Sequence, residues 1–206
     1  MKTSHNSKDL EKEIIENAKQ LFIEKGFAET SMSDIAARTG INRPVLHYYF
    51  RTKDKMFQAV FGSIVLSFVP QVQDIILQKD LPFRERAGKI IDAYYQTFID
   101  NPCLPMFMIR EIYRDPGHLL AVIHELQLEQ YLHKISESLR EEMAAGLLKT
   151  VPLVFVFYTF YGLVAMPFLS RDLLPAAIPD TSFEATFALW RPHIIDQLEN
   201  LLYPQA

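Results

Sequence analysis

The sequence predicts an all-α protein of about nine helices, because apolar residues recur at steps of three and four along most of the chain. Alternating apolar and polar runs, which would indicate strands, are nearly absent, and clusters of proline, glycine and aspartate separate segments of helical length. The chain has 206 residues, 49% hydrophobic and 22% charged, so it can bury a core and does not have the composition of a disordered chain.

A first helix is predicted between Leu10 and Gly26. Leu10, Ile14, Ala18 and Leu21 form one apolar stripe on an otherwise charged segment. Gly26 readily takes the left-handed backbone conformation that ends a helix. The first helix is therefore expected to bury one face and to stop at this glycine.

Two short helices follow. Ser31 can cap the second helix, and Asp34 lies three residues later, as in a capping box. Gly40 is expected to end that helix. Asn42 is a suitable cap for a third helix of about two turns, in which Pro44 is tolerated because the first turn leaves its position without a hydrogen-bond partner.

A fourth helix begins directly afterwards, where Thr52 can cap a segment starting at Lys53. Longer apolar helices are expected beyond residue 60, separated by breaks near 80–82, 101–105, 115–117, 146–152 and 175–180. This pattern predicts a small helical domain at 1–56 followed by a larger helical domain at 57–206.

The second and third helices have the dimensions of a helix-turn-helix, whose second helix enters the DNA major groove. Leu46 and Phe50 would face inward, leaving Arg43 and Tyr48 outside. Arg43 can donate two hydrogen bonds to a guanine edge, and hydroxyl, imidazole and ammonium groups suit phosphates. The candidate DNA contacts are Thr30, Ser31, Ser33, Asn42, Arg43, Pro44, Val45, His47, Tyr48 and Lys53. Capping alone is the alternative for the first three, and a half-buried ring is the alternative for Tyr48.

Residues 14–61, "IIENAKQLFIEKGFAETSMSDIAARTGINRPVLHYYFRTKDKMFQAVF", resemble the DNA-binding domain of the TetR family of bacterial transcriptional regulators. The shared pattern runs through "KGF", "DIA" and "GI" to an aromatic-rich recognition helix and a "TK" entry into the fourth helix. The sequence departs from it at His47, where the family usually has tyrosine, and at Tyr49, where histidine is common.

The resemblance implies a homodimer that binds a roughly palindromic operator and is released from it by an effector. It makes 1–56 a helix-turn-helix DNA-binding domain and 57–206 a helical effector-binding and dimerisation domain. The predicted function is therefore a sequence-specific regulator, most often a repressor in this family, with a small, largely apolar effector. The alternatives are a protein-interaction module, or an enzyme, that has kept the helix-turn-helix shape. The sequence has no Gly-rich phosphate loop, no nucleophile elbow and no two-histidine zinc motif, which argues against an enzyme.

A mixed aromatic and polar stretch at 92–118 can line a largely apolar pocket, or it can be plain core. Arg110 is the most informative residue in it, because a cation among apolar neighbours needs an anion, from Glu111, Asp115 or a ligand carboxylate. The candidate ligand contacts are Tyr94, Phe98, Met106, Phe107, Arg110, Tyr113 and Tyr158.

Residues 151–170 carry no charge and reach the length of a membrane span, but a helix buried within or between subunits is favoured. Paired with a segment at about 182–203, it is the candidate dimer interface, and this four-helix arrangement is what the family resemblance implies. The candidate interface residues are Phe155, Tyr158, Gly162, Met166, Phe187, Trp190 and Ile194.

The remaining composition favours a cytoplasmic protein without a cofactor. Cys103 is the single cysteine, and the spacing of His118, His124 and His133 does not suit a metal site. The net charge is −4, but residues 1–56 carry ten Lys and Arg against eight Asp and Glu. An acidic protein can therefore still present a locally basic surface to DNA.

Overall fold

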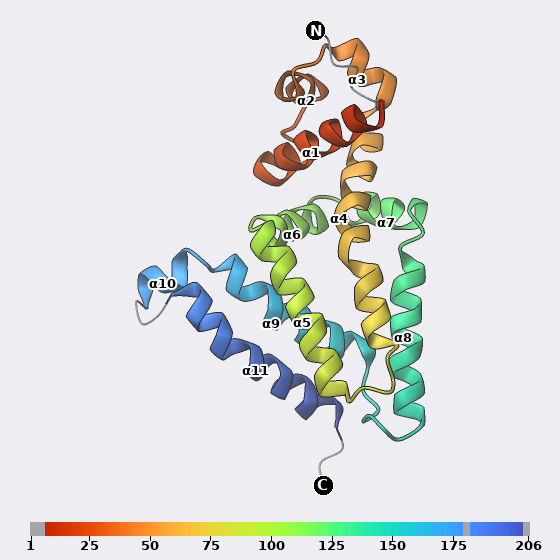
Figure 1. Cartoon of the computed structure of the whole chain (residues 1–206), viewed down its shortest axis with the longest axis vertical. Helices are drawn as coiled ribbons and strands as arrows, with labels where there is room; N and C mark the ends of the chain where they lie inside the picture. The colour runs from red at the N-terminus through yellow and green to blue at the C-terminus, as the bar shows by residue number, and fades with distance from the viewer. Residues whose placement is uncertain (1–6, 179–181, 204–206) are drawn as a thin grey trace. The chain divides into compact units, whose positions relative to one another are not determined.

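The computed structural model describes residues 7–178 and 182–203, and within these ranges it contains only helices. They are α1 (Ser7–Lys25), α2 (Met32–Thr39), α3 (Arg43–Tyr49), α4 (Lys53–Ile76), α5 (Phe83–Asp100), α6 (Leu104–Arg114), α7 (Pro116–Glu125), α8 (Glu129–Ala144), α9 (Leu153–Leu169), α10 (Leu173–Ala177) and α11 (Phe183–Leu202) (Figure 1). The all-α prediction is confirmed. There are more helices than expected, partly because the five-residue α10 is too short to show a repeating apolar pattern. Part of the break expected at 175–180 lies outside the described residues.

The chain divides into two compact units. The first contains residues 7–67 and 106–127, and the second contains 68–105, 128–178 and 182–203. Helices α4 and α6 each contribute residues to both units. The functional division expected between residues 56 and 57 stays a prediction.

Local caps set the helix boundaries of the first unit as the sequence predicts. Ser31 accepts from the Asp34 amide, and the Asp34 carboxylate accepts from the Ser31 amide, which completes the capping box. The Asn42 side chain accepts from the third residue of α3 at 2.9 Å. Gly26 and Gly40 both have positive φ, at 89° and 73°. These short-range interactions hold two helices that are too short to be stable alone.

The core of the first unit draws one apolar face from each helix. Phe22 of α1, Ile35 of α2, Leu46 of α3 and Phe57 of α4 are all fully buried. Phe107 of α6 joins this core, with its ring centroid 6.1 Å from that of Phe57. The recognition helix is thus anchored by Leu46 at its centre, and its other faces need not pack.

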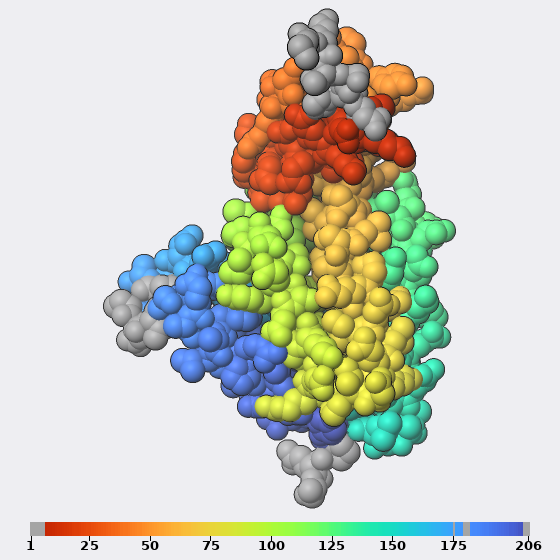
Figure 2. All heavy atoms as spheres, in the orientation of Figure 1, coloured from red at the N-terminus to blue at the C-terminus, as the bar shows by residue number. Residues whose placement is uncertain are grey.

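The second unit is built on α5, which packs against both α9 and α11. Figure 2 shows α11 lying along α5 in this unit. Aromatic rings fill the space between these helices: Tyr95 stacks on Phe187 at 4.1 Å between centroids, and Phe168 meets Phe98 edge-on at 5.1 Å. Offset and edge-to-face ring pairs of this kind add stability beyond the area they bury.

A buried ion pair joins α5 to α8 in the same unit. Both terminal nitrogens of Arg86 donate to the carboxylate of Glu142, at 2.8 and 2.6 Å, and one also donates to the Ile76 carbonyl at 2.7 Å. The pair fixes the end of α4 as well, because Ile76 is the last residue of that helix. Removing one partner would leave an uncompensated buried charge.

The uncharged segment forms α9, whose 17 residues are shorter than a typical span. Among the described residues, α4 is the one helix long and apolar enough to cross a bilayer. A core helix of a folded domain has the same properties. In α4, Met56, Phe57 and Val60 are fully buried in the first unit.

Candidate DNA-binding face and effector cavity

Helix α3 presents the face that the sequence predicts. Leu46 is completely buried, whereas Tyr48 is 82% exposed, and Arg43 and Pro44 are exposed as well. Val45 and His47 are partly exposed. The inward and outward sides of the helix are therefore confirmed. Contact of the outward side with DNA stays a prediction.

A short hydrogen-bond chain orders the exposed end of α3. The Nδ1 of His47 lies 3.2 Å from the Arg51 carbonyl oxygen, so the ring nitrogen carries the proton there and donates. The Nε2 of His47 is then the acceptor, and Arg43 Nε donates to it at 3.3 Å. The histidine that replaces the family's usual tyrosine thus steadies Arg43, the residue best suited to read a base edge.

One candidate DNA contact, Thr30, needs correction, contact of Lys53 with DNA stays a prediction, and two other candidates have a capping role. Thr30 is fully buried, and its hydroxyl donates to the Gly26 and Leu21 carbonyls at 2.9 and 3.3 Å, so it is not available to a phosphate. Lys53 is only partly exposed, and its ammonium donates to the carbonyls of residues 27 and 28 at 3.0 and 3.3 Å. Ser31 and Asn42 are exposed but already cap their helices. Ser33 is exposed.

Two cations lie over the ring of Phe27, in the turn between α1 and α2. The Phe27 ring has the Lys53 ammonium 4.4 Å from its centroid and the Arg114 guanidinium at 4.5 Å. The buried carboxylate of Glu111 accepts from the Phe27 amide at 3.2 Å and from Arg114 Nε at 2.8 Å. A side chain of α6 therefore hydrogen-bonds to the backbone of the turn between α1 and α2.

Arg110, also on α6, binds the end of α1, and its partner differs from the one that the sequence predicts. Its guanidinium donates to the Ile23 carbonyl at 2.9 Å, in the last turn of α1. The partner is thus a helix-end carbonyl, where the helix dipole is negative, rather than a carboxylate. The guanidinium also lies against Gly26, so that a Cβ built on this glycine would be 3.3 Å from it.

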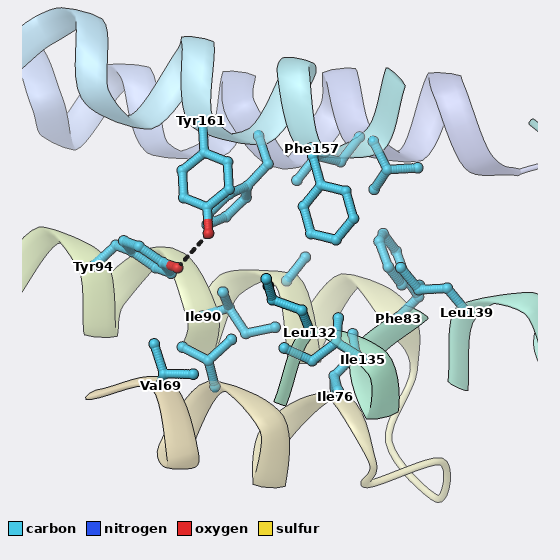
Figure 3. A pocket seen from close by; sticks show the side chains of 15 residues that line it. Val69, Ile76, Phe83, Ile90, Tyr94, Leu132, Ile135, Leu139, Phe157 and Tyr161 are labelled. Atoms are coloured by element: carbon cyan, nitrogen blue, oxygen red, sulfur yellow. Dashed lines mark hydrogen bonds between the residues drawn. The ribbon is translucent and has the colours of Figure 1, made fainter. Parts of the chain in front are cut away.

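A mostly apolar cavity of about 90 Å³ lies within the second unit and is partly open to solvent. It is lined by Val69, Val72 and Ile76 of α4; Phe83, Ala87, Ile90 and Tyr94 of α5; Leu132, Ile135 and Leu139 of α8; Val156, Phe157, Phe160 and Tyr161 of α9; and Leu198 of α11. Figure 3 shows these side chains converging from several helices. A concave apolar site with few polar groups is the usual form of a small-molecule site.

The polar groups of the lining are two phenols. Figure 3 shows Tyr94 and Tyr161 pointing toward one another, and their hydroxyl oxygens are 2.9 Å apart. Burial raises the pKa of Tyr94 well above its ordinary value, with a further contribution from the neighbouring Tyr161. Burial also raises the pKa of Tyr161. Both phenols are therefore neutral at physiological pH and able to donate a hydrogen bond.

The candidate ligand residues lie in both units rather than around one cavity. Only Tyr94 lines the cavity, and Phe98 packs beside it in the aromatic core. Four others belong to the first unit: Phe107 is core, Arg110 caps α1, and Met106 and Tyr113 are exposed. Tyr158 is also exposed. Phe107 and Arg110 have packing roles in the first unit, and ligand contact by the exposed residues stays a prediction. An amphipathic stretch such as α6 shows the same pattern whether it lines a cavity or packs elsewhere.

The candidate dimer residues are also divided. Phe155, Tyr158, Gly162 and Met166 lie exposed along one side of α9. On α11, Phe187 and Ile194 are buried inside the unit, and the indole of Trp190 donates to the Leu163 carbonyl at 3.0 Å. The α11 part of the expectation is therefore wrong for the two buried residues, since they already pack within their own chain. The exposed side of α11 carries Ala185, Leu189, Pro192 and His193 instead.

Comparisons with known proteins agree with this architecture. Residues 14–60 match the family model for bacterial regulatory proteins of the tetR family. The HTH-type transcriptional repressor Rv3405c of Mycobacterium tuberculosis is 32% identical over 127 residues, which cover 56% of this chain and 68% of that protein.

Solved structures share the fold at low sequence identity. A TetR family transcription regulator from Shewanella superposes with a TM-score of 0.71 at 19% identity, covering 95% of this chain and 99% of that one. The transcriptional regulator FadR from Bacillus subtilis, solved in complex with stearoyl-CoA, gives a TM-score of 0.68 at 18% identity, covering 91% and 96%. With the helix-turn-helix and the matching relatives together, the chain belongs to the TetR family of bacterial regulatory proteins.

Proposed function

We propose that this protein is a homodimeric transcriptional repressor that binds a roughly palindromic operator through α3 and leaves it when a small, largely apolar molecule occupies the cavity of the second unit. The observation that carries the proposal is the exposed outer side of α3, with Arg43 and Tyr48 outward and Leu46 buried beneath them. Among the relatives, Rv3405c is a repressor, and FadR was solved with stearoyl-CoA bound.

The proposed DNA contacts on α3 and beside it divide into one that reads a base edge and others that bind phosphates. Arg43 can donate two hydrogen bonds to a guanine edge. Tyr48, Ser33 and the basic Arg51, all exposed, suit phosphate oxygens. Sequence preference would then depend on Arg43, and affinity for any DNA would depend on the surrounding groups.

Dimerisation is proposed through the exposed side of α9 and the outward side of α11. Phe155, Tyr158 and Met166 are more than half exposed, as is Leu189 on α11. Large apolar side chains in a row on one helix usually mark an association surface. Two recognition helices in a dimer would reach half-sites about one DNA turn apart.

Helix α4 is the proposed lever between ligand and DNA. Its Val69, Val72 and Ile76 line the cavity, while its Met56 and Phe57 are core residues of the first unit. A ligand that favours one position of α4 acts on the DNA-binding helices only through its different affinities for the two conformations. Helix α6 also contacts this region, because Arg110 donates to a carbonyl at the end of α1 and Glu111 accepts from an amide in the following turn.

The test is fluorescence polarisation with labelled fragments of the DNA flanking the protein's own gene. We expect one fragment to bind at least about a hundredfold more tightly than random DNA, with affinity falling steeply as salt rises. Arg43→Ala should weaken that fragment about 5- to 150-fold and reduce its preference over random DNA. Arg140→Ala, an exposed arginine of α8, is the matched control and should change nothing.

Two outcomes would contradict the proposal. Binding that is equal for all fragments at moderate salt would remove sequence-specific regulation. An Arg43→Ala protein that binds as the parent does would instead favour a protein-interaction module built on the helix-turn-helix shape.

A further inference from the structure

We infer that the cavity of the second unit selects a slender acyl group whose carbonyl is uncharged, and that Tyr94 and Tyr161 recognise the carbonyl. This inference rests on the proposed function, because it names the chemical class of the effector. The argument uses the charge, the hydrogen-bond capacity and the size of the cavity in turn.

The lining offers no charge to a ligand. Thirteen of its fifteen residues are apolar and the other two are tyrosines. The buried cation of the same unit, Arg86, is already engaged by both carboxylate oxygens of Glu142 and by a backbone carbonyl. An ionised carboxylate placed among these side chains would lose its hydration without gaining a counter-charge. The group that enters must therefore be neutral, and any charged part of the ligand must stay outside.

The tyrosine pair can donate one hydrogen bond to a ligand. Two hydroxyls carry two hydrogens, and the bond between Tyr94 and Tyr161 uses one of them. The other O–H is free to donate: Tyr94 is buried and Tyr161 is 41% exposed, so a ligand that displaces water from this pair must supply the acceptor, because an unpaired buried donor is unfavourable. A carbonyl oxygen supplies this acceptor, whereas an alkane or an alkyl halide supplies little or nothing. The phenols stay protonated because burial raises their pKa values.

The cavity encloses only part of an alkyl chain. Its volume of about 90 Å³ is smaller than the roughly 150 Å³ cavity that holds benzene in an engineered protein, so an eight-carbon chain must extend through the side that is open to solvent. The lining residues come from successive turns of α4, α5 and α8, so the apolar surface extends along the helices. Figure 3 shows the tyrosines at one end of the drawn side chains, which leaves the remaining length for an alkyl chain.

The uncharged acyl group could come from a small ester or amide, or from a thioester on a larger charged carrier. Both present the same carbonyl and alkyl chain. The experiment therefore compares methyl octanoate, octanoyl-CoA, sodium octanoate and 1-chlorooctane, which share chain length and differ in head group. Binding to the full-length protein is measured by equilibrium dialysis at neutral pH.

We expect methyl octanoate, octanoyl-CoA or both to bind at least about tenfold more tightly than octanoate. They should bind about fivefold more tightly than 1-chlorooctane, because the carbonyl accepts one net hydrogen bond that the chloride does not. Which carbonyl compound binds identifies the source of the acyl group. Tyr94→Phe and Tyr161→Phe should each remove the advantage over 1-chlorooctane, because phenylalanine keeps the ring and loses the donor. Ala87→Leu, which fills the cavity, should weaken every compound.

Tighter binding of octanoate than of the ester and the thioester would overturn the inference, as would Tyr→Phe variants that leave the preference for the carbonyl unchanged. DNA release is measured separately by polarisation. An acyl compound that binds as expected but does not release DNA refutes the proposed effector mechanism and leaves the cavity inference intact. Specific DNA binding combined with no affinity for any acyl compound refutes the cavity inference alone.

Discussion

Replacing Gly26 by alanine should destabilise the first unit more than the same change at Gly40, although both glycines end helices with positive φ. At Gly40, φ is 73° and no atom lies within 4 Å of the position of an added Cβ. The change there imposes only the left-handed conformation on alanine, about 1–2 kcal/mol.

At Gly26, φ is 89° and an added Cβ would stand 3.3 Å from three atoms of the Arg110 guanidinium. The guanidinium must move, and its 2.9 Å hydrogen bond to the Ile23 carbonyl weakens or breaks. A hydrogen bond to a charged group contributes about 1.5–3 kcal/mol. Added to the conformational term of about 1–2 kcal/mol, the predicted loss for Gly26→Ala is about 2.5–5 kcal/mol.

The assay is urea unfolding followed by far-ultraviolet circular dichroism. The single tryptophan, Trp190, belongs to the second unit and would miss a transition confined to the first. Arg110→Ala supplies the second arm of a double-mutant cycle. In that background the guanidinium is gone, so Gly26→Ala and Gly40→Ala should destabilise equally. The reasoning is refuted if Gly26→Ala costs no more than Gly40→Ala in the parent, or if its excess cost persists without Arg110.

Three further predictions use the same unfolding measurement. Arg86→Leu or Glu142→Leu alone should destabilise by about 3–5 kcal/mol, whereas the double variant should recover most of the loss; singles as stable as the parent would count against the buried pair. Because burial raises the pKa of Tyr94, its contribution to stability is present below the unfolded value of about 10 and is lost as pH rises above it. Tyr94→Phe should therefore lose less stability than the parent between pH 8 and pH 11. An equal loss in the two proteins would contradict the prediction and would show that the phenol is accessible to solvent. Leu46→Ala should lower the free energy of unfolding by about 2–5 kcal/mol, because Leu46 is completely buried. Tyr48→Ala should change it by no more than about 0.5 kcal/mol while weakening DNA binding. Equal losses of stability would mean that a different side of α3 faces the core.

The sequence by itself determined the boundaries of α2 and α3 and the buried side of α3. Ser31 with Asp34, and Asn42, act on amides three residues away, and Gly40 acts through its own φ. The burial of Leu46 follows from helical spacing next to other apolar positions. These interactions span less than one turn, so a short stretch of sequence contains all the information they need.

Only the tertiary structure decided the partners of the polar side chains near the turn. Arg110 meets a carbonyl 87 residues away, and Glu111 meets an amide 84 residues away. Lys53 likewise donates to the carbonyl of residue 27, 26 residues earlier, at 3.0 Å. Nothing in the spacing of these residues along the chain specifies which distant group each will face.

The cavity shows the same division between local pattern and long-range packing. Phe83, Ala87, Ile90 and Tyr94 repeat at steps of three and four, as a plain core helix would. Whether such faces meet fully or leave a space depends on how the volumes of side chains from five helices add up. Periodicity determines which residues turn inward, but the fit between distant inward faces determines whether a ligand can enter.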